Sequence, residues 1–342
     1  MSQQMKALVW HGKSDLRLES VPVPSIGARE VLVKVRYSGI CATDQEIFNG
    51  EYPYKPPYTL GHEITGTIAK TGSEADHLPI GTRVVVDPAI PCEVCRFCRQ
   101  GKWEFCRNYR ELGITEDGGW AEYAKAPARC VYAIPDSMSD MAAAVFEPLV
   151  CPLNASEAAG IHTGDHVLVL GDGPAAMYFV QIARMMGAAA IAVSYRQQAR
   201  TDALRLYGAN ELVESDNIDR LRTTSCYMDH DGFDLVIDAV GSSETVLQAV
   251  NMARVGGRII LYGLKEAESR AFPHREMVLK NLTLYGRTNG PSLWLKALEL
   301  VGSGALTIDT IADHVISAGE AARLLSLSSW PWVKAVIDWE KA

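Results

Sequence analysis

The chain has 342 residues, a formal net charge of −8 and a hydrophobic content of 48%. This length predicts two domains, and the composition excludes a disordered chain, which would have few apolar residues and a large charge imbalance. An acidic surface is unsuited to binding nucleic acid, and no apolar run is long enough to cross a membrane. The N-terminal residues do not show the pattern of a signal peptide. We therefore expect a cytoplasmic protein without nucleic-acid or membrane partners.

The first stretch, to about residue 150, is predicted to be β-rich. Its β-branched runs are broken by Gly, Pro and Asp, which is typical of strands joined by turns. The runs occupy residues 30–40, 59–72 and 82–88.

The same stretch carries residue types that bind metal ions: Cys41 in GICATD, His62 and Glu63 in LGHEITG, and Glu147 in VFEPLVCP. A catalytic zinc ion needs about three protein ligands and one open position, and these types suit it. Their spacing is long, so plainer roles stay open: a core thiol, a hydrogen-bonded His–Glu pair and a helix-start acid.

Four of the eight cysteines form one cluster with the pattern C-x2-C-x2-C-x7-C: Cys92, Cys95, Cys98 and Cys106. Four thiolates complete a tetrahedral zinc shell with no open position, which predicts a structural zinc ion. A disulfide scaffold would instead be a small secreted chain with cysteines throughout. An iron–sulfur cluster and four free thiols are the alternatives.

The middle of the chain alternates apolar runs with helix-like segments, which indicates a parallel sheet covered on both faces. The runs are residues 166–171, 189–194, 233–240, 257–263 and 282–286. The last stretch is too short for a domain and is expected to pack on the first. We therefore predict a zinc-containing domain of residues 1–152 and 289–342, interrupted by a dinucleotide-binding domain of residues 153–288.

A glycine-rich turn of the pattern G-x-G-x-x-A follows the first of these apolar runs and opens a helix, with Gly171, Gly173, Pro174 and Ala176. The first glycine allows the sharp turn, the second lets a pyrophosphate approach the backbone, and the small third residue lets helix pack on strand. The free N–H groups of the helix N-terminus would bind the phosphates. This pattern predicts dinucleotide binding.

The end of the second strand suggests which dinucleotide binds. NAD-binding proteins usually carry an acid there for the ribose 2′-hydroxyl, but this chain has Ser194, followed by Arg196 and Arg200. Serine can donate to a 2′-phosphate and arginine can pair with it, which favours NADP(H) over NAD(H). The alternative is that both arginines point into solvent.

Together these motifs resemble the zinc-dependent medium-chain dehydrogenase/reductase family over essentially the whole chain. The carriers are KALVW, GICATD, GHEITGTIAKTG, the cysteine cluster, GGWAEY, the EPL of VFEPLVCP, and the glycine turn. The resemblance implies an α/β fold, with a GroES-like β-rich catalytic domain and a doubly wound Rossmann domain. It also implies one catalytic and one structural zinc ion, and a homodimer or homotetramer.

The resemblance also implies roles for single residues. Cys41 and His62 match catalytic zinc ligands, Glu63 matches the acid that ligates the metal or lies beside it, and Glu147 matches the fourth position, where polyol dehydrogenases carry Glu. Thr43 matches the hydroxyl that relays the substrate proton, and Arg287 a polyol-contacting arginine.

The expected function is therefore hydride transfer between NADP(H) and a secondary alcohol of a polyol, sugar or (amino)cyclitol, giving a ketone. An NAD-dependent alcohol or threonine-type dehydrogenase of the same family is the first alternative. A family member that kept the fold as a non-catalytic binding protein is the second.

Overall fold

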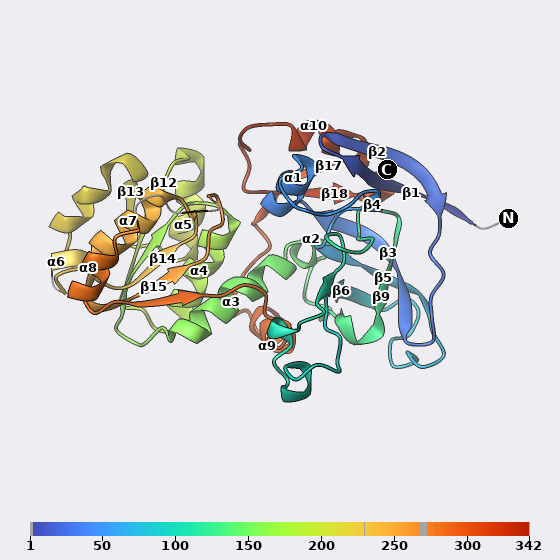
Figure 1. Cartoon of the computed structure of the whole chain (residues 1–342), viewed down its shortest axis with the longest axis horizontal. Coiled ribbons are helices and arrows are strands. Elements are labelled where there is room, and N and C mark those ends of the chain that lie inside the picture. The colour runs from blue at the N-terminus through green and yellow to red at the C-terminus, as the bar shows by residue number, and fades with distance from the viewer. Residues whose placement is uncertain (1–2, 229, 267, 269–271, 342) are drawn as a thin grey trace. The chain divides into compact units, whose positions relative to one another are not determined.

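The computed structural model describes residues 3–228, 230–266, 268 and 272–341, and the chain forms two compact units (Figure 1). Unit 1 comprises Met1–Glu147, Pro291–Ser303 and Ile308–Ala342, and unit 2 comprises Pro148–Gly290 and Gly304–Thr307. The first break lies at the start of helix α3 (Glu147–Ala159). The boundary expected from the sequence, after residue 152, falls further along inside that helix.

Unit 1 is built mainly on a seven-stranded sheet with the order β10-β6-β5-β3-β18-β17, in which β9 also pairs with β3. Its strands are β3 (Glu30–Gly39), β5 (Ile64–Thr71), β6 (Arg83–Val86), β9 (Tyr123–Pro127), β10 (Val131–Ala133), β17 (Ala312–Ile316) and β18 (Lys334–Asp338). Val336 of β18 lies opposite Gly39 of β3, so the last stretch of the chain packs on the first.

Two smaller sheets and several short helices complete unit 1. The sheets contain β2 (Asp15–Pro22), β1 (Gln4–Gly12) and β4 (Tyr58–Thr59), and β7 (Ala89–Ile90) with β8 (Arg110–Glu111). The helices are α1 (Ala42–Phe48), α2 (Asp140–Ala143), α9 (Trp294–Gly302) and α10 (Ala321–Leu325), with 3-10 turns η1 (Cys98–Gln100), η2 (Trp103–Phe105), η3 (Ala128–Cys130), η6 (Ala318–Glu320) and η7 (Trp339–Lys341). Apolar side chains of the large sheet, α1 and α10 form a core cluster that includes Val33, Ile68 and Trp120.

Unit 2 is a six-stranded parallel sheet with the order β13-β12-β11-β14-β15-β16. Its strands are β11 (His166–Leu170), β12 (Ala190–Tyr195), β13 (Glu211–Glu214), β14 (Phe233–Asp238), β15 (Ala253–Leu261) and β16 (Thr283–Gly286). Its other helices are α4 (Pro174–Met185), α5 (Thr201–Tyr207), α6 (Ser225–Met228), α7 (Ser243–Met252) and α8 (His274–Leu279), with η4 (Gln198–Arg200) and η5 (Ser215–Thr223).

The strand order of unit 2 is that of a doubly wound nucleotide-binding sheet, 3-2-1-4-5-6 along the chain. All six residues of β14 are buried, as expected for a central parallel strand that helices cover on both faces. In such sheets ligands bind at the carboxyl ends of the strands, where the order reverses, which here is beside β11. No helix among the described residues is long and apolar enough to span a membrane.

Candidate active site

Three of the predicted metal ligands of unit 1 converge in one buried place. Cys41 precedes helix α1, and His62 and Glu63 precede strand β5. The Sγ of Cys41, a ring nitrogen of His62 and a carboxylate oxygen of Glu63 all lie within 4.8 Å of one another. His62 is 5% exposed and Glu63 is fully buried.

Local backbone geometry explains why these segments meet. Gly39 N–H donates to the Glu63 carbonyl at 3.0 Å, which ties the two segments together. A Cβ at Gly39 would lie 1.8 Å from the Glu63 carboxylate, so only glycine leaves room for that side chain. Gly61 has a φ of +90°, and a Cβ there would overlap the Trp120 ring. The glycines of GICATD and LGHEITG therefore serve close packing around the candidate ligands.

Asp44 orients both Cys41 and His62, a role that the sequence reasoning missed. Its Oδ2 accepts the backbone N–H of Cys41 at 2.8 Å, and its Oδ1 lies 3.5 Å from Nδ1 of His62. A metal-binding histidine usually directs its second ring nitrogen to a carboxylate, which leaves Nε2 for the metal. The only signal in the sequence was an acid three residues after Cys41, which also reads as a helix-capping residue.

Glu63 also has a partner that the sequence reasoning missed. Lys334 Nζ lies 2.5 Å from Glu63 Oε1, and both side chains are buried. Burial lowers the pKa of Lys334, but Glu63 and Cys41 outweigh it and raise that pKa above its ordinary value. A lysine in the apolar run WVKAVIDW was the available signal, because a buried lysine needs a partner.

The residues of this group fit a bound cation. Among the described residues, Glu63 Oε2 is buried without a hydrogen-bond partner, while His62 Nδ1 and Asp44 Oδ1 face each other at 3.5 Å. Burial lowers the pKa of His62, yet Asp44 and Cys41 together raise it well above its ordinary value. The negative groups thus outweigh burial, and a thiol, an imidazole and a carboxylate are ligands that zinc accepts.

Glu147 lies near this group but outside it. Within the described part of the chain, the set of ligand atoms within 4.8 Å contains Cys41, His62 and Glu63 and not Glu147. Burial raises the pKa of Glu147 to about 8, with His62 lowering it and Glu63 and Glu111 raising it. Glu111, in strand β8, is a further acid facing the same place; its own pKa is raised by burial and lowered by His62.

Thr43 lies beside the candidate metal ligands. The Cys41 thiol donates to its Oγ1 at 3.8 Å, and the side chain is half-buried in the first turn of α1. A hydroxyl in this position can pass a proton between a group at the metal and solvent.

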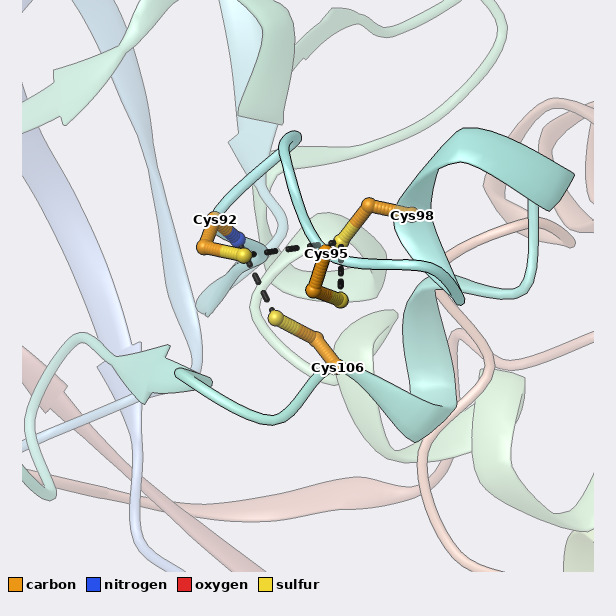
Figure 2. Close-up of side chains that lie close together, drawn as sticks. All are labelled: Cys92, Cys95, Cys98 and Cys106. Carbon is orange, nitrogen blue, oxygen red and sulfur yellow. Dashed lines mark hydrogen bonds between the residues drawn. The ribbon is translucent and has the colours of Figure 1, made fainter.

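The four clustered cysteines also converge (Figure 2). The sulfurs of Cys92, Cys95, Cys98 and Cys106 lie within 4.8 Å of one another, with Cys95 Sγ 3.5 Å from Cys98 Sγ. Backbone N–H groups of Cys98 and Arg107 lower the pKa of Cys95 to about 6, whereas burial raises that of Cys98 to about 12. A tetrahedral metal ion suits four sulfurs in this arrangement.

The glycine turn of unit 2 has an open space above it. Gly171 has a φ of +117°, and a Cβ there would lie 3.0 Å from Val240. Gly173 has an extended backbone and caps α4, and a Cβ there would meet nothing within 4 Å. Pro174 is in the first turn of the helix, and Ala176 is fully buried against the sheet. The turn therefore fits the approach of a pyrophosphate.

The three residues predicted to select NADP(H) differ in their surroundings. Ser194 is 2% exposed at the end of β12. The Arg196 side chain is exposed, with its Nη2 3.9 Å from Glu244. Arg200 does not point into solvent: it is buried, and its Nη1 lies 3.2 Å from Asp172 Oδ1. Asp172, the middle residue of the glycine turn, was missed by the sequence reasoning because that position accepts any residue.

Arg287 lies in unit 2, after strand β16. It is exposed, and its Nη1 donates to the Gly286 carbonyl at 3.0 Å. Its predicted contact with a substrate stays a prediction.

The fold and the two clusters of candidate metal ligands, one of Cys41, His62 and Glu63 and one of four cysteines, define a class of protein. A β-rich unit with two candidate metal groups and a doubly wound nucleotide-binding unit are the two parts of a metal-dependent dehydrogenase. Two family models match the chain: "Alcohol dehydrogenase GroES-like domain" over residues 27–136 and "Zinc-binding dehydrogenase" over residues 175–303.

Individual relatives agree with these models. D-arabinitol dehydrogenase 1 of Uromyces fabae is 30% identical over 321 residues, which is 93% of this chain and 92% of the relative. L-threonine 3-dehydrogenase of Bacillus licheniformis is 31% identical over 321 residues, 92% of each. A zinc-binding dehydrogenase from Sinorhizobium meliloti, solved bound to NADP, is 32% identical with a TM-score of 0.93, covering 98% of this chain and all of that one.

The chain belongs to the zinc-dependent medium-chain dehydrogenase/reductase family, and is an enzyme of the NAD(P)-dependent alcohol dehydrogenase type. This confirms the predicted family, its GroES-like and Rossmann fold, and the predicted oxidoreductase class.

Proposed function

We propose that this enzyme interconverts a secondary alcohol of a polyol, sugar or (amino)cyclitol and the corresponding ketone. The observation that carries the proposal is the convergence of the ligand atoms of Cys41, His62 and Glu63 within 4.8 Å of one another, with His62 and Glu63 buried. Support for a polyol comes from Glu147 beside this group and from the similarity to D-arabinitol dehydrogenase 1.

In this proposal Cys41 and His62 hold the catalytic zinc ion, with Glu63 and Glu147 as the acids that complete or adjust its ligand set. When bound, the zinc ion supplies Lewis acidity toward the substrate oxygen and the nicotinamide takes up the hydride. Thr43 holds the hydroxyl proton of the substrate and passes it to solvent. Asp44 keeps the His62 ring in the orientation that leaves Nε2 for the metal.

The second metal ion of the proposal is structural and is held by Cys92, Cys95, Cys98 and Cys106. The predicted cytoplasmic location and the predicted homodimer or homotetramer remain part of the proposal. The non-catalytic alternative is set aside because every candidate ligand is present and the relatives named above are dehydrogenases.

The coenzyme enters the proposal as NAD(P)(H), with NADP(H) as the preference predicted from sequence. Ser194, the exposed Arg196 and the NADP-bound neighbour are the arguments for NADP(H), whereas the contacts of Asp172 at the same strand end argue for NAD(H). Ser194→Asp tests that prediction, because a new carboxylate at the strand end should raise the efficiency with NAD relative to NADP. An unchanged ratio would contradict it.

A second candidate function is a threonine-type dehydrogenase, which the 31% identical L-threonine 3-dehydrogenase favours. A substrate panel separates the two candidates. Oxidation of D-arabinitol, sorbitol, cyclitols, L-threonine and simple alcohols is followed at the absorbance of the reduced nicotinamide. Preference for a polyol or cyclitol supports the first proposal, and preference for L-threonine supports the second.

The metal centre is tested with Cys41→Ser and His62→Ala. Each variant should lose turnover and should carry one zinc ion per chain where the unaltered enzyme carries two, measured by atomic emission. Cys130→Ala is the matched control, because it removes a buried thiol outside both groups and should keep both ions. Full turnover in either ligand variant would refute the zinc mechanism.

A further inference from the structure

The end of strand β12 has no acid of its own but receives one from the neighbouring turn. Asp172 Oδ2 accepts the backbone N–H groups of Arg196 and Gln197 at 2.8 and 2.7 Å. Its Oδ1 lies 3.2 Å from Nη1 of Arg200, and its side chain is 11% exposed. The Asp172 carboxylate therefore accepts two backbone N–H groups and pairs with one arginine, all from the segment that follows Ser194.

This is the part of a doubly wound sheet where the adenosine ribose binds. The glycine turn and the strand end are joined, because Gly171 N–H donates to the Ser194 carbonyl at 3.0 Å. In NAD-binding proteins an acid at the end of the second strand accepts the ribose 2′-hydroxyl, and an arginine nearby accommodates a 2′-phosphate. Asp172 thus supplies a carboxylate at the end of this strand, where Ser194 supplies none.

The cations of this segment also face carboxylates. Arg200 is paired with Asp172, and Arg196 lies 3.9 Å from Glu244. The N–H groups of Arg196 and Gln197, which could otherwise bind an anion, donate to Asp172. A 2′-phosphate would therefore find the Arg200 guanidinium and these two N–H groups already bound to a carboxylate, which it would have to displace in order to bind them.

We infer that Asp172 selects the coenzyme by disfavouring a ribose 2′-phosphate, so that the enzyme binds NAD(H) more tightly than NADP(H). This inference rests on the proposed function, which requires a nicotinamide dinucleotide on this turn. It reverses the preference predicted from Ser194 and Arg196, because that prediction treated the strand end as free of carboxylates.

The test is equilibrium binding of NADH and NADPH to the intact, zinc-loaded enzyme without substrate, followed by nucleotide fluorescence. The unaltered enzyme should bind NADH more tightly. Asp172→Asn keeps an acceptor for the two N–H groups but removes the charge, so the ratio of the two dissociation constants should move about tenfold toward NADPH. The change should come mainly from tighter binding of NADPH.

A second test variant and a matched control complete the experiment. Glu244→Gln alters an exposed acid, so folding is not at risk, and by releasing Arg196 it should move the ratio the same way by about threefold. Asp219→Asn is the matched control: it removes one exposed negative charge elsewhere in unit 2 and should leave the ratio unchanged within about twofold.

Three results would overturn the inference: tighter binding of NADPH by the unaltered enzyme, an unchanged ratio in both Asp172→Asn and Glu244→Gln, or a shift toward NADH. The proposed function survives all three, because the enzyme would still bind a dinucleotide. If the unaltered enzyme bound neither nucleotide, the proposed function would fail together with the inference.

Discussion

Lys334 and Glu63 form a buried ion pair whose two members come from opposite ends of the chain. The lysine lies in strand β18, between β3 and β17, and the pair neutralises an acid that has no access to water. Such a pair is weak evidence of net stability, but the loss of one member leaves an uncompensated buried charge.

Lys334→Met should therefore destabilise the zinc-depleted protein by about 3–5 kcal/mol, which is a fall of roughly 10 °C in the thermal midpoint. Lys334→Met combined with Glu63→Gln should regain most of this loss, because no charge stays buried. Differential scanning calorimetry of the two variants measures both effects. A fall of less than about 2 °C for the single variant would show that Glu63 finds another partner.

Asp87 is a buried acid in the same unit, 4% exposed, and its Oδ1 accepts the Ala89 N–H at 2.9 Å. Burial raises its pKa well above the ordinary value, and Glu147 and Glu111 add to this, while the Ala89 N–H lowers it. The folded protein thus holds a proton that the unfolded chain releases above a pH of about 4. Stability therefore falls as the pH rises above the ordinary pKa of Asp87 in the unfolded chain, and it stops falling once the pH passes the raised pKa of Asp87 in the folded protein.

Asp87→Asn should remove this penalty, because the amide accepts from Ala89 and stays neutral. The variant should melt at a higher temperature than the unaltered protein at pH 8, and the difference should shrink toward pH 4.5. Thermal melts at the two pH values measure it. A difference independent of pH, or a less stable variant at pH 8, would contradict the assignment of a protonated carboxyl.

At the scale of elements, the loop that carries the cysteine cluster and the glycine turn show how short segments create binding sites. The helical structure of this loop consists of the short 3-10 turns η1 and η2, and Cys98 is the one buried residue within them. Few apolar contacts hold such a segment, so a metal ion on its four sulfurs is the expected source of its order.

The two glycines of the turn before α4 have different roles. Gly171 needs its positive φ, and a Cβ added there would lie 3.0 Å from Val240, whereas Gly173 has an ordinary backbone and a Cβ added there would meet nothing within 4 Å. Gly173→Ala should therefore keep the thermal midpoint but weaken NADH and NADPH equally, by about tenfold or more, because the methyl group occupies the path of the pyrophosphate.

Fluorescence titration and a thermal melt of Gly173→Ala check this. The common loss for both nucleotides separates the turn from Asp172, which is expected to act on the ratio alone. Unchanged affinity would mean that the pyrophosphate does not approach Gly173.

At the scale of the whole molecule, the two units carry separate cores and separate tasks. The candidate zinc ligands all belong to unit 1, and the glycine turn, Asp172 and the end of β12 all belong to unit 2. Chelation that removes the catalytic zinc should therefore abolish turnover but change the dissociation constant of NADH by less than about twofold. Titration before and after chelation measures this, and loss of binding along with the zinc would contradict the division of tasks.

Much of this architecture could be predicted from local pattern. The apolar runs of 166–171, 189–194 and 233–240 became β11, β12 and β14, because central parallel strands are apolar along their whole length. The cysteine cluster was predictable from spacing alone, because its four sulfurs come from one short loop.

The sequence by itself determined the family, the fold and the residues of each motif, since these depend on periodicity and on spacing within short segments. Only the tertiary structure decided which distant groups face them. Asp44 and Lys334 beside the ligands, Glu111 beside Glu147, and Asp172 at the end of β12 depend on strand pairing between remote segments. Burial then fixes their charge and their partners, which no local pattern records.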